Sequence, residues 1–209
     1  MWVKGEAQTS QEDKAIQHPW SRMLFRFWEA TRAERSAPHR HDLDLKQIRA
    51  LVPYLFIAEQ PEGTLDFRWR LAGTGICHLY GRELTGKPFL TGWDDFEAAV
   101  IHRFLGAVTG MHQPALLRLR LGTVRGQTLT AEMAAFPVLA SDEVNTHVLG
   151  GLFPFADPSH DDPDGLATFE LQSARLVWTE TIPPAIEGAN AAPPARPRFH
   201  VIAGGRSRG

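Results

Sequence analysis

Cysteine and histidine are adjacent once in the chain, at Cys77 and His78. A thiolate beside an imidazole is the pair that cysteine-dependent enzymes use as nucleophile and base. Adjacent residues on a helix, however, point about 100° apart, so these two side chains do not face each other. Catalytic Cys–His pairs normally come from segments that are distant in the sequence. The pattern therefore favours a free, small, buried Cys77 over a nucleophile.

His39 and His41, followed by Asp42 and Asp44, form a second group with chemical potential. Alternate side chains of extended backbone lie on one side, and imidazole and carboxylate are metal ligands. No second cluster with ligand spacing accompanies them. Cys77 is the only cysteine, which excludes an internal disulfide and a cysteine-based zinc site. A solvated loop is the preferred interpretation, and we predict no metal.

Catalytic motifs of other kinds are missing from the sequence. It contains no Gly-x-Gly-x-x-Gly or P-loop pattern. Its one Gly-x-Ser-x-Gly match, at residues 205–209, lies in the tail rich in proline, glycine and arginine, outside the strand–turn–helix context that this motif needs. Glu132 is the one acidic candidate for a buried site, but it alternates with Ala131 and Met133, so a strand glutamate that faces outward is the simpler view. We identify no catalytic residue and predict that the protein is not an enzyme.

Composition limits the partners. The 209 residues are 43% hydrophobic and 22% charged, with a formal net charge of −2, so there is no basic footprint for nucleic acid. The arginines of the last fourteen residues are few and lack an aromatic platform. No run of about 18 apolar residues predicts membrane insertion, and residues 1–14 do not resemble a signal peptide. We therefore expect a cytoplasmic protein.

A helix that begins at Pro19 has the strongest pattern in the chain. Its apolar residues recur at helical spacing along one stripe, and two of them are tryptophans. Burying such a stripe stabilises by several kcal/mol at roughly 25 cal/mol per Å², so it must dock either on its own sheet or on a second copy. We predict an interaction surface, and a homodimer, on the residues Trp20, Met23, Leu24, Phe27 and Trp28.

The remaining elements alternate between strands and helices. Asp44 is a predicted N-cap for a short helix that ends at Pro53, and residues 54–59 form the first strand. A strand over residues 66–71 then breaks at Gly73 into helical turns that stop at Gly81 and Gly86. Further along we expect a long helix over 94–111, strands over 115–121, 128–139 and 145–155, and one more strand or helix over 168–179.

Two segments resemble one known family. The spacing Pro38-x-Arg40-x-Asp42-x-Asp44 ahead of Leu51-Val52-Pro53 is similar to the start of a PAS-like family common in alphaproteobacteria. Phe67-Arg68-Trp69-Arg70-Leu71-Ala72-Gly73-Thr74, with Tyr80-Gly81-Arg82-Glu83-Leu84-Thr85-Gly86, resembles its central signature. Leu45 departs from the pattern, where the family tends to carry proline. In this family a short PAS domain is usually the whole protein.

The resemblance and the element order imply an α+β fold of PAS-like type. We expect a five-stranded antiparallel sheet with helices over one face, plus the N-terminal amphipathic helix. The predicted organisation is a disordered leader over residues 1–17, a helical extension over 18–53, a PAS-like domain over 54–156, a linker with an extra element over 157–182, and a disordered tail over 183–209.

PAS domains often hold haem, flavin or a small molecule between sheet and helices. His102 lies on the helix that carries the ligand in haem sensors, but a helical wheel points it to solvent. Cys77 lies in a segment unlike the reactive-cysteine motif of flavin photoreceptors. Haem and flavin are therefore not expected, and the cofactor is unknown. Five residues are predicted to line a ligand cavity: Arg70, His78, Tyr80, Trp93 and Met133. For Arg70, pairing with a carboxylate is the simpler alternative.

The resemblance implies a sensory and regulatory module without an output domain, which acts through a small organic ligand, through docking on an unidentified signalling protein, or both. The alternative is a small α+β enzyme of the ketosteroid-isomerase-like kind, or a ligand carrier, that acts on an apolar metabolite. Such an enzyme needs a carboxylate or histidine inside its pocket. A structural adaptor whose cavity is filled by its own side chains is a third possibility.

Overall fold

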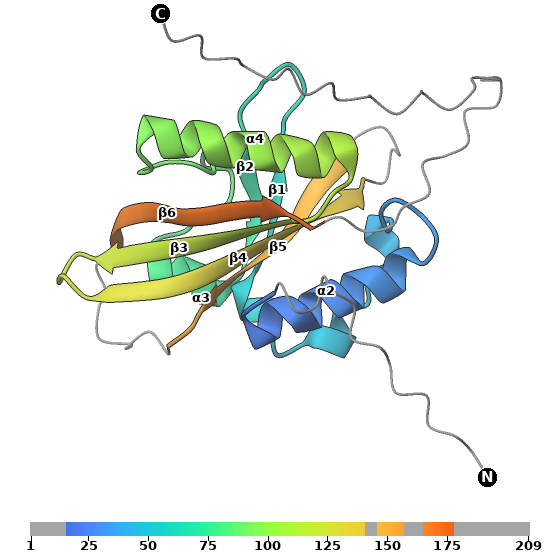
Figure 1. Cartoon of the computed structure of the whole chain (residues 1–209), viewed down its shortest axis with the longest axis horizontal. Coiled ribbons are helices and arrows are strands. Elements are labelled where there is room, and N and C mark those ends of the chain that lie inside the picture. The colour runs from blue at the N-terminus through green and yellow to red at the C-terminus, as the bar shows by residue number, and fades with distance from the viewer. Residues whose placement is uncertain (1–15, 141–145, 157–164, 178–209) are drawn as a thin grey trace, which may run out of the picture.

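A computed structural model describes residues 16–140, 146–156 and 165–177 (Figure 1). One antiparallel sheet runs through it in the order β2-β1-β5-β4-β3-β6. The predicted leader and tail, and the linker at 157–164, lie wholly or mostly outside the described residues. The strands are β1 (Leu55–Glu59), β2 (Arg68–Ala72), β3 (Ala115–Thr123), β4 (Thr128–Leu139), β5 (Thr146–Pro154) and β6 (Leu166–Leu176).

The predicted α+β, PAS-like fold is confirmed, with six strands in place of five. The sixth, β6, resolves the alternative left open for residues 168–179, because it pairs along the whole of β3. Helices α3 (Thr74–Tyr80) and α4 (Asp95–Met111) cover one face of the sheet, and α2 (Pro19–Arg32) covers the other (Figure 1). Three short 3-10 helices connect α2 to β1: Arg40–Asp42, Leu45–Ile48 and Val52–Tyr54.

Helix α4 packs on the sheet through a narrow face. Ile101, Leu105 and Val108 are fully buried, whereas the apolar Met111 at the end of the helix is 55% exposed. Apolar residues occur on most sides of this helix, and Phe96 is exposed as well. A pattern with so broad an apolar arc does not define one buried stripe. The buried face of α4 is therefore determined by its packing against the side chains of the sheet.

The apolar stripe of α2 docks on the sheet of its own chain. Leu24 and Trp28 are fully buried and Phe27 nearly so, in a second core on the outer face of the sheet. Trp20 is half-buried and Met23 is 46% exposed. Of the two docking partners predicted from sequence, the chain's own sheet is therefore the one that covers most of this stripe. A dimer on the remaining surface stays a prediction.

Glu132 anchors the start of α2. Its neighbours Ala131 and Met133 belong to the inner core, so Glu132 points to the outer face, as expected. It is nevertheless only 3% exposed, because the backbone of residues 16–18 covers it. Its carboxylate accepts hydrogen bonds from the N–H groups of Gln17 and His18, at 3.2 and 3.0 Å. A buried carboxylate that accepts two N–H groups is a structural anchor.

His18 is the N-cap of α2 and acts in its neutral form. Its Nδ1 accepts the N–H of Trp20 at 3.1 Å, so its Nε2 carries the proton and donates to the carbonyl of Pro154. Burial lowers the pKa of His18 below the ordinary value, against the opposing effects of the Pro154 carbonyl and Glu132. Burial likewise lowers the pKa of His112, whose ring lies between the hydroxyls of Ser36 and Thr146.

We predict that the protein loses stability as the pH falls from about 7.5 to 5.5. A histidine whose folded pKa lies below its unfolded value of 6.5 favours folding while neutral, and the unfolded chain takes up the proton first. Urea unfolding at several pH values measures this slope. His18→Asn keeps a capping acceptor and removes the titrating ring, so its slope should be smaller. An equal slope in both proteins would contradict the role of His18.

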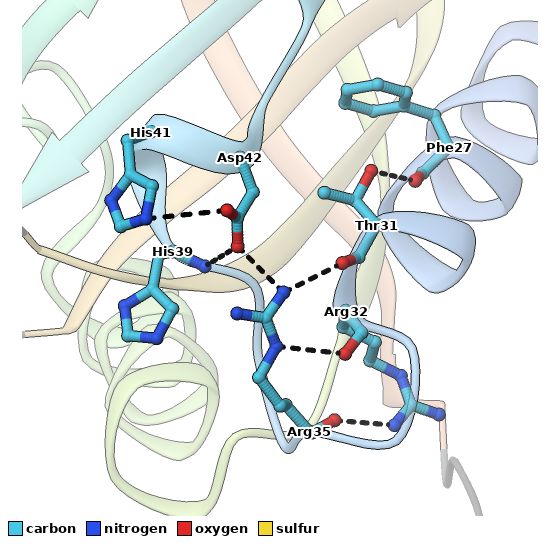
Figure 2. Close-up of polar contacts among 7 residues, drawn as sticks. All are labelled: Phe27, Thr31, Arg32, Arg35, His39, His41 and Asp42. Atoms are coloured by element: carbon cyan, nitrogen blue, oxygen red, sulfur yellow. Dashed lines mark hydrogen bonds and ion pairs between the residues drawn. The ribbon is translucent and has the colours of Figure 1, made fainter.

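The loop after α2 is tied to the end of that helix by a polar cluster (Figure 2). Arg35 donates to the carbonyl oxygens of Thr31 and Arg32, at 3.1 and 3.2 Å, and pairs with Asp42 at 2.7 Å. Asp42 also accepts the N–H of His39 at 3.2 Å. Arg35 thus satisfies free carbonyl groups at the C-terminal end of α2. Asp42, from the early signature, holds the Arg35 guanidinium in place.

The same cluster bears on the metal hypothesis. The rings of His39 and His41 stack with centroids 5.2 Å apart, and Nε2 of His41 lies 3.4 Å from Asp42 (Figure 2). The Arg35 side chain, followed by other hydrogen bonds, lowers the pKa of Asp42, so the carboxylate is already neutralised by a cation. Among residues 16–140, 146–156 and 165–177, no group of three or more His, Cys, Asp and Glu could hold a metal ion.

Candidate functional site

A pocket of about 180 Å³ lies beside β2, where residues 82–91 wrap around the edge of the sheet. The N–H of Gly86 donates to the carbonyl of Trp69 at 2.6 Å, and the N–H of Trp69 donates to Lys87 at 3.0 Å. The N–H of Phe89 donates to Phe67 at 2.8 Å. These bonds satisfy the backbone of an edge strand that would otherwise be open to pairing. They also hold one wall of the pocket.

The pocket has an apolar floor and a polar rim. The floor consists of four buried residues. Three are aromatic, Trp69, Tyr80 and Phe89, and the fourth is Leu84. The Trp69 and Phe89 ring centroids are 4.2 Å apart, and the Trp69 and Tyr80 centroids are 5.8 Å apart. The exposed residues of the rim are Arg82, Lys87, Pro88 and Thr91. A concave site with an aromatic floor and a few polar groups is the usual form of a small-molecule site.

Tyr80 enters the floor from the last turn of α3. The helix ends at Gly81, which has a φ of 64° and closes it in the left-handed conformation that glycine adopts without strain. Burial raises the pKa of Tyr80 far above its ordinary value, against a smaller opposite effect of Arg82. Its hydroxyl therefore stays protonated. It has no hydrogen-bond partner among the described residues.

The rim carries positive charge. Arg82 and Lys87 form no ion pair with any residue that the structure describes. Glu83 follows Arg82 in sequence but is turned into its own loop. Its Oε1 accepts the N–H groups of Leu84 and Thr85, at 3.0 and 2.9 Å, and the hydroxyl of Thr85 at 2.7 Å. These bonds, those from Thr85 first, lower the pKa of Glu83 and keep it ionised in this position.

Of the five residues predicted to line a cavity, Tyr80 lines this pocket. Trp93 does not line the pocket but is separated from Tyr80 by the ring of Phe169. The Phe169 ring centroid lies 5.2 Å from that of Trp93 and 5.4 Å from that of Tyr80. Met133 is buried in the inner core between the sheet and the helices, outside the pocket lining. His78 is exposed on α3, because it falls on the side away from Leu79 and Tyr80. The pocket thus lies to one side of the cavity expected from the fold.

Arg70 pairs with a carboxylate, which is the simpler of the two alternatives predicted for it from sequence. Its guanidinium pairs with the carboxylate of Glu59 at 2.5 Å, and His147 lies 3.7 Å from the same carboxylate. A bulge shifts the pairing of β1 and β2 between Ile57 and Ala58, next to Arg70. Trp69 points into the inner core and the Arg70–Glu59 pair lies on the outer face. Arg70 is therefore not among the residues that line the pocket.

Cys77 and His102 both have structural contacts. The Cys77 sulfur lies 3.9 Å from the carbonyl of Ala72 and 3.8 Å from Glu83. Burial raises the pKa of Cys77, so the thiol is protonated and a weak nucleophile. Nε2 of His102 lies 2.6 Å from the carbonyl of Leu65, and its ring packs on Phe67 at 5.5 Å. His102 is more covered than the helical wheel indicates, because the loop between β1 and β2 folds over it.

Several lining residues escaped the sequence reasoning. Arg82 and Leu84 enter the sequence analysis only as parts of a signature, and no sequence pattern marks Lys87 or Phe89. They reach the pocket only because the loop pairs with β2, a contact that no local periodicity reports. The available signal was Trp69, a large aromatic residue on the inward face of an edge strand next to a glycine-rich segment.

The fold agrees with a comparison to known families. A family model described as PAS domain matches residues 16–153, which is most of the chain. The chain belongs to the PAS domain family. The match begins at residue 16, so it includes α2 as well as the sheet. PAS domains are typically sensory modules without catalytic activity, which agrees with the sequence-based prediction that the protein is not an enzyme.

Other comparisons add less about this PAS domain. A solved structure described as "Flavin Analogue Sheds Light on Light-Oxygen-Voltage Domain Mechanism" is 17% identical to it. The alignment covers 54% of this chain and 84% of the other, with a TM-score of 0.40. That similarity supports no inference about flavin here. No curated protein matches the chain. Within the part of the chain that the structure describes, no helix is long and apolar enough to cross a membrane.

Proposed function

We propose that this PAS domain is a sensory and regulatory module that binds a small organic ligand in the pocket beside β2. The pocket of about 180 Å³ with its buried aromatic floor is the observation that supports this proposal. It is smaller than the roughly 300–1,000 Å³ of sites that hold drug-sized ligands, so the ligand is a small metabolite. Its occupancy is passed on to a signalling protein that docks on the PAS domain.

The chemistry of the lining favours binding over catalysis. None of the eight lining residues is a carboxylate or a histidine, which the enzyme alternative requires as its acid or base. Glu132, the acidic candidate from sequence, lies on the opposite face of the sheet and accepts two backbone N–H groups there. A ligand carrier would use the same pocket, and the distinction from a sensor is whether ligand binding changes the affinity for a partner.

Two walls of the pocket belong to segments that can respond to a ligand. One is the end of α3 at Tyr80, and the other is the loop 82–91, held to β2 by the backbone bonds of Trp69 and its neighbours. A ligand that contacts both walls stabilises one arrangement of the loop relative to the helix. We propose that the partner reads this arrangement. Homodimerisation through α2, a cytoplasmic location and an alphaproteobacterial source stay predictions.

A blocked pocket tests the proposal. Thr91 is exposed on the rim, so Thr91→Phe places a ring over the opening without disturbing the core. Thr128→Phe, at an exposed strand end far from the pocket residues in sequence, is the matched control. A screen of small metabolites by thermal denaturation should find compounds that raise the melting temperature of the parent and the control but not of Thr91→Phe. Equal responses of all three proteins would contradict the proposed site.

A further inference from the structure

We propose that the pocket selects a small organic anion, with its charged group between Arg82 and Lys87 and its apolar body on the aromatic floor. This inference rests on the proposed function, because it names the ligand class of that same pocket. Arg82 and Lys87 are two of the eight lining residues, and no acidic residue is among them. Because the charged residues of the lining are both cationic, we expect the ligand to be negatively charged.

Among the described residues, both rim cations are without an ion pair. Some other arginines of this protein are paired with a carboxylate, as Arg35 is with Asp42 and Arg70 with Glu59. Neither Arg82 nor Lys87 has an ion-pair partner in the described part of the chain. An arginine guanidinium and a lysine ammonium on the lining of one pocket offer several N–H donors and no acceptor. An anion satisfies such a rim, whereas a cationic ligand is repelled.

Among the described residues, Glu83 is the carboxylate next to Arg82 in sequence, and its hydrogen bonds hold it within its own loop. One of its oxygens accepts three hydrogen bonds from Leu84 and Thr85, at 2.7 to 3.0 Å. Turning it toward Arg82 would leave the N–H groups of this tight loop without an acceptor. The loop thus engages Glu83 in its own hydrogen bonds, and neither cation pairs with a described carboxylate.

The floor determines the rest of the ligand. Trp69, Leu84 and Phe89 present buried apolar surface, on which a flat ring or short hydrocarbon chain packs well. The Tyr80 hydroxyl adds one donor at the edge of this surface. A pocket of about 180 Å³ holds a single ring with one acidic group and is too small for a fused polycyclic cofactor. Aromatic or short-chain carboxylates are the class that fits.

Isothermal titration with three probes of similar size tests the charge. Benzoate, benzamide and benzylamine share one ring and differ in carrying a negative, neutral or positive group. We expect benzoate to bind at millimolar concentration, about tenfold more tightly than benzamide, with no binding of benzylamine. In Arg82→Gln/Lys87→Gln the affinity for benzoate should fall about tenfold while that for benzamide is unchanged. Raising the salt concentration should weaken benzoate binding in the parent.

The control variant is Lys46→Gln/Arg49→Gln, which removes the same two charges from exposed sites outside the pocket lining. It should bind benzoate like the parent. The proposal is overturned if benzamide binds as tightly as benzoate, if the control loses as much affinity as the rim variant, or if benzoate does not bind the parent up to about 50 mM. If a neutral metabolite still stabilises the parent and not Thr91→Phe, only the anion class is wrong. If no compound does so, the proposed function fails as well.

Discussion

Replacing Trp28 with alanine is expected to lower the free energy of unfolding by about 3–5 kcal/mol. The indole is fully buried between α2 and the sheet, stacked on Phe136 with ring centroids 5.6 Å apart. Its Nε1–H donates to the carbonyl of Pro137 at 2.8 Å. The pairing of β4 with β3 ends at Ala135, so this carbonyl lies beyond the ladder and needs a donor. The substitution therefore leaves both a cavity and an unpaired carbonyl.

Chemical denaturation followed by circular dichroism measures this loss. Met23→Ala on the same helix is the matched control, since Met23 is 46% exposed and its truncation should cost less than about 1 kcal/mol. A Trp28→Ala protein that unfolds at the same denaturant concentration as the parent would show that α2 is not held on its own sheet. The outer core would then not exist as described.

Gly73→Ala is expected to destabilise by about 3 kcal/mol, at the upper end of the usual range for overpacking. A Cβ at this position would overlap the backbone carbonyl groups of Val52 and Pro53, which cannot rotate away. Gly73 also donates its N–H to Leu55 and accepts the N–H groups that begin α3, so its backbone has little freedom to shift. Thermal denaturation measures the loss.

Gly106→Ala provides the contrast within the same protein. Gly106 lies inside α4, its φ is not positive, and a Cβ added there would meet no atom within 4 Å beyond the backbone of its own helix. Alanine there should raise stability by about 0.5–1 kcal/mol, because it is the better helix former. If Gly73→Ala were as stable as the parent, the close approach of the β2–α3 turn to Pro53 would not exist in solution.

Local patterns were sufficient for most of the fold. The alternation around Trp69 predicts β2, and the stripe through Trp28 predicts α2 at the residue where it begins, Pro19. Gly81 and Gly86 take the positive φ values of 64° and 78° that their places after helical turns suggested. Gly73 has an ordinary φ of −66°, so its requirement is for space against Pro53 and not for an unusual backbone.

The site was less predictable because it depends on contacts between distant segments. Trp69 and Phe89 lie twenty residues apart and meet only because the loop pairs with the edge of β2. Glu132 is buried because residues 16–18, more than a hundred positions earlier, fold over it. The choice of buried face on α4 is decided by the sheet in the same way. Tyr80, which was predicted to line a cavity, reaches the pocket from the last turn of α3 next to the cap at Gly81.

The claim that this PAS domain holds a small ligand beside β2 is tested most directly by mass spectrometry of the protein purified from cells. Native and denaturing spectra are compared for the parent and for Thr91→Phe. We predict an extra mass of a small organic acid on the native parent, lost on denaturation and missing from Thr91→Phe. Equal native and denatured masses for the parent, or the same extra mass on both proteins, would contradict the claim.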